Sequence, residues 1–544
     1  MLIDFRKEPA AADGWSDVCV IGAGAAGIPL ARRLAGLGHS VCLLESGGLE
    51  YEQDTQDLCR GANVGMEYYD LDESRLRFFG GTTRIWGGRC ALLDHIDFEH
   101  REWVPHSGWP ISRKELDPYY QQAHDFFELG EFNYENDIWS TLGIPEQPFD
   151  SEQIDARLWR FDELNERFGP TRCVDLIESS KVRILLHANV MRLQAGSSAQ
   201  SIEYVVVKSL DGVERKIQAR HFVLAAGAIE NPRLLLASND LESTGIGNGY
   251  DQVGRYFMEH PCGRIARVKI ERPFEMWAAM QKRFMPSGPP LAPVLRLGES
   301  TQRATGALNS AVTFKLQRDP SRGVPLVGKI YPLVKHAMHP NRTGLALDHA
   351  YRAIRGWVHR EVRGPIEHLR TRLGMRGLYL IMRGEQSPNP DSRVRLSTTR
   401  DALGNLQADL DWQLLSADKR TAQVFNQTFD TELKRLGLGK LEPSDWIDSA
   451  ESQWPVDPTV GNHPIAGYHH MGTTRMSAAP ANGVVNADCQ VHGYQNLFVA
   501  GSSVFSTSGW ANPTLTIVAL SYRLADHLDG RLRDHDRTQG EKGA

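Results

Sequence analysis

Hydrophobic positions in the first fifty residues fall into two short runs with an amphipathic stretch between them. The apolar runs at 17–21 and 41–44 predict two buried strands, while residues 25–37 carry helical periodicity. A strand, a helix and a second strand in this order predict one βαβ unit with parallel strands. We therefore expect the chain to begin with an α/β domain of the Rossmann-like kind.

Three glycines join the first predicted strand to the helix. Gly22, Gly24 and Gly27 form a GxGxxG turn, in which the first permits the tight turn and the second lets a pyrophosphate approach the backbone. The third lets helix and strand pack closely, and the phosphates lie on the helix N-terminus. Glu45 ends the second strand, where a carboxylate accepts hydrogen bonds from ribose hydroxyls. The pattern predicts a site for an adenine dinucleotide.

Two further glycine-containing turns are expected at the same cofactor. Residues 77–90, RFFGGTTRIWGGRC, place four glycines around Trp86, and glycine lets backbone lie against a flat ring system. A simple turn with a buried tryptophan is the alternative. A hairpin over 201–224 leads to the Ala-Ala-Gly-Ala run at 225–228 and to a helix from about Asn231, which again brings backbone close to a ligand.

The pattern changes after about residue 262. Alternating segments at Cys262–Ile270 and Thr305–Phe314 predict an antiparallel sheet, the usual floor of a substrate domain. Residues 113–129 predict a helix, and residues 181–193 predict one strand. We expect a discontinuous nucleotide-binding domain that consists of residues 14–120, 171–262 and 456–540. Residues 121–170 are expected to form a surface excursion or lid, and residues 263–455 a substrate domain.

Residues 315–376 are basic and predicted to be helical. The apolar side chains of one face are separated from the arginines, and we expect this face to pack on the domain as a lid helix with a solvated basic back. Docking on a membrane surface or on an acidic redox partner is the alternative. The apolar face consists of Leu347, Ala350, Ile354, Trp357 and Val358, and the arginines are Arg352, Arg355, Arg360 and Arg363.

Composition excludes several classes of function. The chain has 544 residues and a net charge of -6, which argues against a nucleic-acid partner. It has no apolar run of about eighteen residues and no apolar leader before the first strand, so we expect no membrane span and a cytoplasmic location. Seven cysteines without a CxxC pair indicate reduced thiols and no metal site.

The last ninety residues carry the candidate chemistry. Residues 467–476 read GYHHMGTTRM, and a buried strand at 496–500 precedes a helix from Thr514 to Leu528. A histidine such as His469 can take the hydroxyl proton of an alcohol, and Asn512 can orient the alcohol oxygen without adding charge. A structural or surface role is the alternative for the adjacent histidines. No third histidine or carboxylate stands at the spacing of metal ligands.

Together these motifs resemble the glucose-methanol-choline (GMC) oxidoreductases, flavoproteins that oxidise alcohols, sugars and other CH–OH donors. The resemblance implies FAD, a Rossmann-like FAD-binding domain built from three segments, and a discontinuous second domain of α+β character on a mostly antiparallel sheet. It covers both ends and the middle of the chain but not residues 262–450. The matching segments are the first βαβ unit, GGTTRIWGG, AAGAIENPRLLLAS, VGRYFMEHP, HHMGTTRM and SSVFSTSGWANPTLTIVALSYRLA.

The resemblance also implies roles for single residues. The first histidine of H-x-x-G-T is the family's catalytic base and falls on His469, with His470 as the alternative, and the residue before proline falls on Asn512. Some relatives bond FAD covalently through a histidine where this chain has Ile85, so we expect dissociable FAD. Many relatives have histidine where Trp510 stands. The wording of the motifs is similar to that of bacterial sugar-oxidising and pyranose-type members.

The function that follows is oxidation of an alcohol or sugar, with hydride transfer to flavin N5 and with oxygen or another redox acceptor as partner. Alternatives are a lyase of the same family that keeps FAD as structure, a redox subunit that passes electrons to a partner, and an NAD-linked dehydrogenase. The residues expected to contact FAD are Gly22, Gly24, Ala25, Ala26, Gly27, Glu45, Ser46, Gly80, Gly81, Thr82, Trp86, Gly87, Gly88, Val190, Ala226, Gly227, Gly501, Ser502, Asn512, Pro513 and Thr514.

Overall fold

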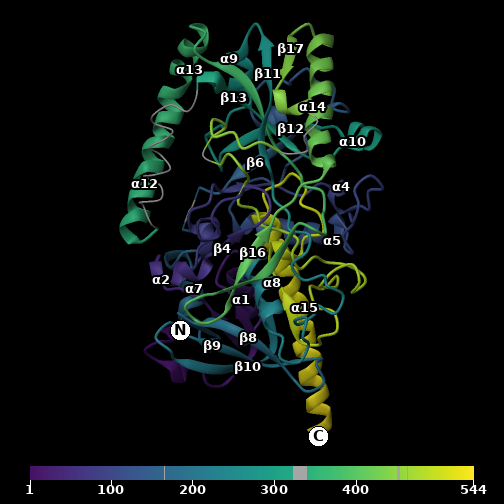
Figure 1. Cartoon of the computed structure of the whole chain (residues 1–544). Coiled ribbons are helices and arrows are strands. Elements are labelled where there is room, and N and C mark those ends of the chain that lie inside the picture. The colour runs from purple at the N-terminus through teal and green to yellow at the C-terminus, as the bar shows by residue number, and fades with distance from the viewer. Residues whose placement is uncertain (164–165, 323–339, 450–453, 462, 544) are drawn as a thin grey trace.

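The computed structural model describes residues 1–163, 166–322, 340–449, 454–461 and 463–543. Figure 1 shows an elongated molecule with one sheet in its lower half and a second sheet in its upper half. The long C-terminal helix α15 (Thr514–Gly543) begins near the middle of the molecule and runs down to the C-terminus. The start of α15, the predicted catalytic end, therefore lies between the two sheets.

The lower sheet has eight strands and contains the predicted βαβ unit. Its central strands are parallel, as expected for a Rossmann-like fold, and two antiparallel strands extend one side as a hairpin. Helix α1 (Gly27–Gly36) connects two of the central strands. The strand order is β1 (Leu2–Asp4), β7 (Val182–Leu186), β3 (Val41–Leu44), β2 (Trp15–Ile21), β10 (Glu214–Leu224), β9 (Ile202–Lys208) and β8 (Asn189–Ala195), with β18 (Leu497–Val499) paired to β10.

Two local predictions in this half were inaccurate. The single strand expected over 181–193 is two strands, because the backbone turns at His187, which has a left-handed φ of 58°. β7 then joins the parallel strands while β8 joins the hairpin. The helix expected from about Asn231 begins earlier, as α8 (Gly227–Ala237), and the Asn231 side chain accepts a hydrogen bond from the Ala226 N–H at 2.9 Å.

The upper sheet has seven strands, and every neighbouring pair is antiparallel, as the sequence predicts. One face packs against α14 (Ser416–Arg435) in a core of Leu, Phe and Met side chains. The predicted strand at Thr305–Phe314 begins only at Ala311, because Glu299–Thr305 forms helix α10. The strand order is β17 (Gly439–Pro443), β11 (Cys262–Ile270), β14 (Gly377–Arg383), β13 (Ala311–Gln317), β12 (Leu291–Leu297), β6 (Ile154–Phe161) and β5 (Arg89–Cys90).

Strand β6 corrects the picture of residues 121–170 as a surface excursion. Its residues 154–160 pair with β12, and the strand therefore belongs to the upper sheet. The reason is visible in its burial, since five of its eight residues, including Leu158 and Trp159, face one core or the other. Helix α5 (Arg113–Phe126) ends at Phe126 rather than at 129, and its Tyr120 hydroxyl lies 2.8 Å from the Thr516 hydroxyl of α15.

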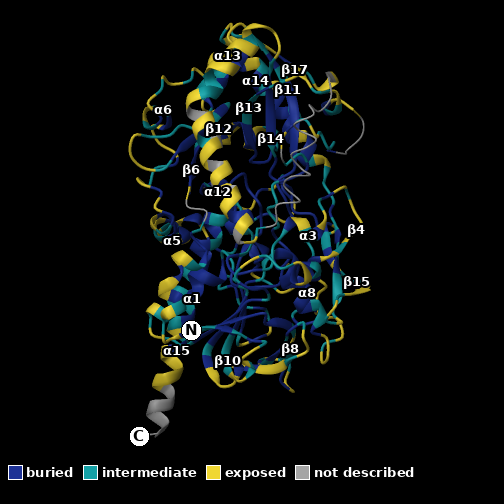
Figure 2. Cartoon of the chain, turned by 90° about the vertical axis from the view of Figure 1, so that its left-hand side faces the viewer, coloured by how far each residue is buried: buried dark blue, intermediate teal, exposed yellow. Residues whose placement is uncertain are grey.

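The basic helical segment does not pack as predicted. α12 (Arg342–Trp357) continues through a π-helical turn (Val358–Val362) into α13 (Arg363–Arg372) along one side of the molecule (Figure 2). Leu347, Ile354 and Trp357 are 52%, 63% and 55% exposed, so the predicted apolar face points to solvent and not onto the domain. Residues 323–339 of this segment, and the side chains of Arg352, Arg355 and Arg360, lie outside what the structure describes.

Three smaller features complete the fold. β15 (Arg393–Arg400), β16 (Leu406–Asp411) and β4 (Gly61–Asn63) form a third sheet. All seven cysteines are buried as free thiols. Within the described ranges, no helix has the length and apolar character needed to cross a membrane.

Candidate active site

The GxGxxG turn has one glycine that faces open space and two that packing requires. A Cβ on Gly22, whose φ is +112°, would lie 2.6 Å from the Ala225 carbonyl oxygen, and one on Gly27 would lie 1.9 Å from the Gly22 oxygen. A Cβ on Gly24 would meet no atom within 4 Å. The open side of Gly24 lies at the N-terminus of α1, where free N–H groups favour a phosphate. The turn therefore fits the pyrophosphate of a dinucleotide.

Three other predicted cofactor segments converge on this helix N-terminus. A Cβ on Gly81 would lie 3.9 Å from the Gly24 Cα, and one on Gly501 would lie 3.7 Å from the Ala26 Cβ. Gly227, at the start of α8, has a φ of +87° and would place a Cβ in open space. The glycine loop, the strand end before α8 and the C-terminal turn thus surround one end of α1, as a shared ligand requires.

Glu45 is held by the same turn. Its carboxylate accepts the Ala23 N–H at 3.1 Å and the Gly47 N–H at 2.9 Å, and the Ser46 hydroxyl donates to it at 3.3 Å. Burial raises the pKa of Glu45, and these hydrogen bonds oppose the shift. The carboxyl group is therefore fixed at the end of β3, the position from which it can reach a ribose.

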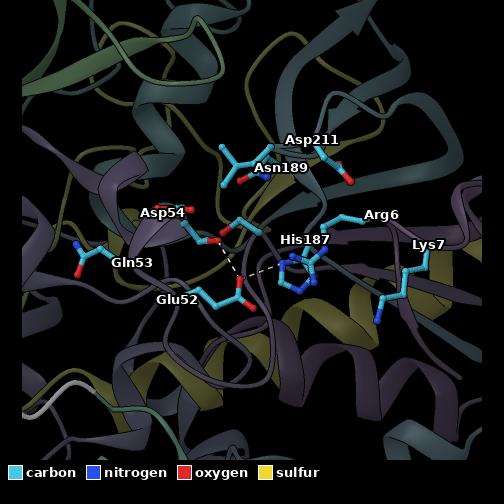
Figure 3. Close-up of a pocket in the computed structure, with 11 residues that line it drawn as sticks. Arg6, Lys7, Glu52, Gln53, Asp54, His187, Asn189 and Asp211 are labelled. Carbon is cyan, nitrogen blue, oxygen red and sulfur yellow. Dashed lines mark hydrogen bonds and ion pairs between the residues drawn. The ribbon is translucent and has the colours of Figure 1, made fainter.

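A cavity of about 580 Å³ opens beside Ser46 (Figure 3). His187 and Glu52 both line it and contact each other, with Nδ1 and Oε2 3.3 Å apart. Asn189 also lines the cavity, and its Oδ1 is buried without a hydrogen-bond partner among the described residues. The next residue is Val190, one of the predicted cofactor contacts. An orphaned acceptor beside the ribose end of the turn fits the adenosine half of FAD.

Gly88 is a predicted cofactor residue that packing explains instead. A Cβ at Gly88 would lie 1.9 Å from the Asp162 carbonyl oxygen, so this glycine lets the loop approach the end of β6. Thr82 Oγ1 accepts the Leu76 N–H at 3.1 Å inside the same loop. The remaining predicted residues lie on the elements already described: Ala25 before α1; Gly80, Trp86 and Gly87 in the loop; Ala226 before α8; Ser502 after β18; and Pro513 and Thr514 at the start of α15.

The predicted catalytic pair lies together before α15. Asn512 Nδ2 is 3.0 Å from His469 Nε2, so the Asn512 amide donates to this ring nitrogen. On the other side of the ring, His469 Nδ1 is 2.8 Å from His260 Nδ1, and His260 Nε2 is 2.8 Å from the Gly509 carbonyl oxygen. A carbonyl only accepts, so neutral His260 carries its proton on Nε2. His469 must then carry its proton on Nδ1, which leaves Nε2 with a lone pair.

Glu259 fixes the backbone of the histidine segment. Its fully buried carboxylate accepts the His260 N–H at 2.7 Å, the Gly467 N–H at 3.1 Å, the His469 N–H and the Tyr68 hydroxyl at 2.8 Å. Burial raises the pKa of Glu259 to about 7, against the effect of these hydrogen bonds. One acidic side chain thus ties residues 259–260 to residues 467–469.

Gly472 allows the two segments to cross closely. Its φ is +85°, and a Cβ there would lie 2.2 Å from the Tyr256 carbonyl oxygen. Met258 and Met471 form an antiparallel bridge at this crossing, and the Gly472 N–H donates to the Ser502 oxygen at 3.1 Å. The glycine of H-x-x-G-T is therefore needed to place the histidine segment between residues 256–260 and the turn after β18.

His470 is turned away from Asn512. Its Nε2 lies 2.9 Å from the Tyr68 hydroxyl, and its carbonyl accepts the Ser502 hydroxyl at 2.6 Å. Burial lowers the pKa of His470 to about 3 and that of His260 to about 4. Burial, followed by the electrostatic effects of His260 and of nearby arginines, also holds the pKa of His469 well below its usual range. The structure thus brings His469 to Asn512 as a neutral imidazole.

Sequence reasoning missed Glu259, His260 and Tyr68. The first two lie in the VGRYFMEHP segment, which belongs to the family resemblance but predicts no role for either residue. That segment was the available signal, whereas nothing local points to Tyr68. Trp510, two residues before Asn512, is buried and donates its Nε1–H to Asp94 Oδ2 at 2.8 Å.

Two family models and several characterised proteins are similar to this chain in sequence. The family described as FAD dependent oxidoreductase matches residues 17–242, and the family described as GMC oxidoreductase matches residues 388–521. Fructose dehydrogenase large subunit of Gluconobacter japonicus is 23% identical, covering 94% of this chain and 97% of that protein. 2-Methyl-1,2-propanediol dehydrogenase of Mycolicibacterium austroafricanum is 25% identical, covering 95% and 96%.

Solved structures share the fold over nearly the whole length. Pyridoxine 4-oxidase from Mesorbium loti aligns with a TM-score of 0.54 at 16% identity, covering 94% of this chain and 99% of that one. A fungal aryl-alcohol oxidase aligns with a TM-score of 0.54 at 14% identity, covering 95% and 99%. The glycine turn, the converging cofactor segments and both family matches lead to one conclusion: the chain is an FAD-dependent oxidoreductase of the GMC family.

Proposed function

We propose that this enzyme oxidises a CH–OH group of a sugar, glycoside or other alcohol, with His469 as the base that accepts the hydroxyl proton. The observation that carries the proposal is the contact of 3.0 Å between His469 Nε2 and Asn512 Nδ2. The lone pair of His469 Nε2 and the amide of Asn512 lie close enough together for one alcohol oxygen to contact both.

FAD, when bound, supplies N5 as the acceptor of the hydride that leaves the alcohol carbon. The protein residues handle the proton and the oxygen. His469 Nε2 takes the proton of the hydroxyl group, and the Asn512 amide donates a hydrogen bond that holds the oxygen in place. Loss of one hydride and one proton converts the CH–OH group into a carbonyl, so the reaction balances.

The low pKa of His469 suits it to start the reaction unprotonated. Burial and neighbouring positive charges disfavour the imidazolium form, so the ring is neutral at physiological pH. The hydrogen bond from His469 Nδ1 to His260 keeps the reactive lone pair on Nε2. His260 is therefore a positioning residue, which acts on the substrate only through His469.

We propose the same FAD contacts as the sequence predicts, except for Gly88, which packing explains. Residues 14–120, 171–262 and 456–540 form the proposed FAD-binding domain, extended by β1 at the N-terminus. Strands β5 and β6 are assigned to the substrate domain with residues 263–455. Ile85 cannot form the bond to flavin that a histidine forms there, so the FAD is proposed to be dissociable. A cytoplasmic location remains a prediction from the sequence.

The names of the similar proteins support a hydroxylated substrate, but these proteins differ in whether they are called dehydrogenases or oxidases. They are named as dehydrogenases of fructose and of 2-methyl-1,2-propanediol, and as an oxidase of 6'''-hydroxyparomomycin C. We therefore propose either oxygen or a protein redox acceptor as partner. A lyase that keeps FAD as structure is the competing function.

An anaerobic screen separates these functions. Purified holoenzyme is mixed without oxygen with sugars, glycosides, diols and hydroxy acids, and the flavin absorbance is followed. Oxidation bleaches the flavin with at least one compound. A lyase converts its substrate and leaves the flavin oxidised. Reoxidation of the bleached enzyme by air, or only by an added acceptor, then assigns oxidase or dehydrogenase.

A further inference from the structure

One face of the upper sheet is turned toward the nucleotide-binding half and carries basic side chains. Ala311 belongs to the core shared with that half, whereas its neighbour Val312 belongs to the core of the upper sheet. Side chains alternate along a strand, so Lys315 lies on the face of Ala311. Arg383 is the cross-strand partner of Ala311 and shares this face, as does Trp159 on β6, which lies in the same core as Ala311.

Arg383 ends strand β14 next to the segment that carries His260. It pairs with Cys262 across the sheet, and the next residue, Gly384, donates its N–H to the Pro261 carbonyl at 2.9 Å. His260, directly before Pro261, is the residue whose Nδ1 lies 2.8 Å from His469. The charge of Arg383 contributes, after burial, to the lowered pKa of both histidines. Arg383 therefore lies close enough to His260 and His469 for its charge to act on both rings.

Arg383 and Lys315 have no negatively charged partner among the described residues. Among the described residues, the Arg383 guanidinium makes no hydrogen bond or ion pair, and Lys315 Nζ donates to the Val460 carbonyl oxygen at 2.9 Å. Burial, together with the like charges of Arg383 and Arg89, lowers the pKa of Lys315 to about 8. Partly buried cations are costly unless an opposite charge compensates them. A bound anion would provide that charge.

A neutral donor lies on the same face. Trp159 is 4% exposed, and its Nε1 has no hydrogen-bond partner among the described residues. The Arg89 guanidinium lies 5.4 Å from the centre of the Trp159 ring, which is 6.1 Å from that of Trp510, two residues before Asn512. The cations and the unpaired N–H donor thus lie between Arg383, near His260, and Trp510, near Asn512.

We propose that the substrate carries an anionic group, a carboxylate or a phosphate, which binds to Arg383 with Lys315, Arg89 and Trp159 around it while the hydroxyl group faces His469. This proposal rests on the proposed function and narrows its substrate class to hydroxy acids, sugar acids or sugar phosphates. A guanidinium matches the geometry of either oxyanion through two parallel hydrogen bonds. The cations select the substrate, and His469 with Asn512 acts on the hydroxyl group.

Matched substrates test the preference for an anion. Anaerobic flavin reduction by the holoenzyme is measured with D-glucose, D-gluconate and D-glucose 6-phosphate, and with 1,2-propanediol and lactate. We expect kcat/KM for a charged member to exceed that of its neutral counterpart by about 10- to 100-fold, the value of a charge-assisted hydrogen bond. The gluconate and phosphate arms distinguish the two oxyanions. Equal or higher kcat/KM for the neutral members overturns the proposal.

Variants assign the preference to Arg383. Arg383→Gln should bring the charged-to-neutral ratio close to one, mainly by raising KM for the charged member. Arg303→Gln, which removes a surface guanidinium paired with Glu299, is the control and leaves the ratio unchanged. A ratio that survives in Arg383→Gln contradicts the assignment.

Anion binding without turnover provides an independent readout. The dissociation constant of sulfate is measured from its perturbation of the flavin spectrum in the wild-type and Arg383→Gln holoenzymes. We expect sulfate to bind at least about tenfold more weakly to the variant. Equal binding to both enzymes overturns the anion site. If no alcohol reduces the flavin, the proposed function fails, while the sulfate measurement still decides whether the anion site exists.

Discussion

His260 Nδ1 lies 2.8 Å from His469 Nδ1, although the two residues are 209 positions apart in the sequence. The Gly509 carbonyl holds the proton of His260 on its other nitrogen, so His260 can only accept from His469. This contact selects the tautomer of His469 whose lone pair faces Asn512. In the proposed mechanism His260 thereby determines which nitrogen of His469 can react, and it does so without contacting the substrate itself.

Substitution of His260 tests this positioning role. In an asparagine the amide oxygen can occupy the place of Nδ1 and accept the same hydrogen bond, whereas leucine cannot. We expect His260→Leu to lower the rate constant of flavin reduction by about 10- to 100-fold and His260→Asn to recover most of that loss. Single-turnover reduction measures both. If the two variants lose the same rate, the hydrogen bond is not what His260 contributes.

Gly24 and Gly27 have different roles in the turn: Gly24 leaves space for a ligand, and Gly27 allows close packing of the backbone. A Cβ on Gly24 meets no protein atom within 4 Å, whereas one on Gly27 would lie 1.9 Å from the Gly22 oxygen. Gly24→Ala should therefore weaken FAD binding while the melting temperature of the apoprotein stays unchanged. Gly27→Ala should lower that melting temperature as well. Flavin content and apoprotein melting report the two effects, and unaltered FAD affinity in Gly24→Ala would contradict a pyrophosphate at this turn.

His470 makes folding stability depend on pH. Burial lowers its pKa to about 3 from a value of 6.5 in the unfolded chain. Below pH 6.5 the unfolded chain binds a proton that the folded protein excludes, so stability is lost as the pH falls from 6.5 toward 3. The loss is at most about 1.4 kcal/mol per pH unit.

His470→Gln removes this titration and keeps a hydrogen-bonding group near the Tyr68 hydroxyl. Between pH 7.5 and 5.5 the melting temperature of the variant should fall less than that of the wild type. His95→Gln, at an exposed histidine, should behave like the wild type. A variant that loses as much stability as the wild type shows that His470 is not the titrating group.

The presence of Ile85 predicts that FAD is bound without a covalent link at this position. Because an aliphatic side chain forms no bond to the isoalloxazine, acid precipitation should release all of the FAD into the supernatant. Absorbance of the supernatant and the colour of the pellet give the result. Flavin that stays with the precipitated chain would mean a covalent link through a different residue.

Local features were predictable from the sequence, and long-range contacts were not. The βαβ unit could be identified because its glycines, helix and acid lie within 17–45, and the helix before which Asn512 stands was marked by a proline. His260 and β6 escaped because their partners are distant: β6 pairs with β12, and His260 with His469. Periodicity describes one segment at a time and does not report which segments meet.

The lid prediction was wrong for a different reason. Helical periodicity predicts that apolar and basic positions lie on different faces of the helix, but it does not say which face turns inward. In the structure Leu345, near the beginning of α12, is buried, while Ile354 and Trp357, near its end, are exposed.

Anaerobic single-turnover reduction of His469→Ala tests the central claim most directly. The wild-type enzyme and the variant, both loaded with FAD, are mixed with the best substrate of the screen, and the decay of flavin absorbance is recorded. Loss of general-base catalysis should slow reduction by about 10²- to 10⁴-fold while FAD remains bound. Reduction of the variant at the wild-type rate would contradict the assignment of His469 as the base.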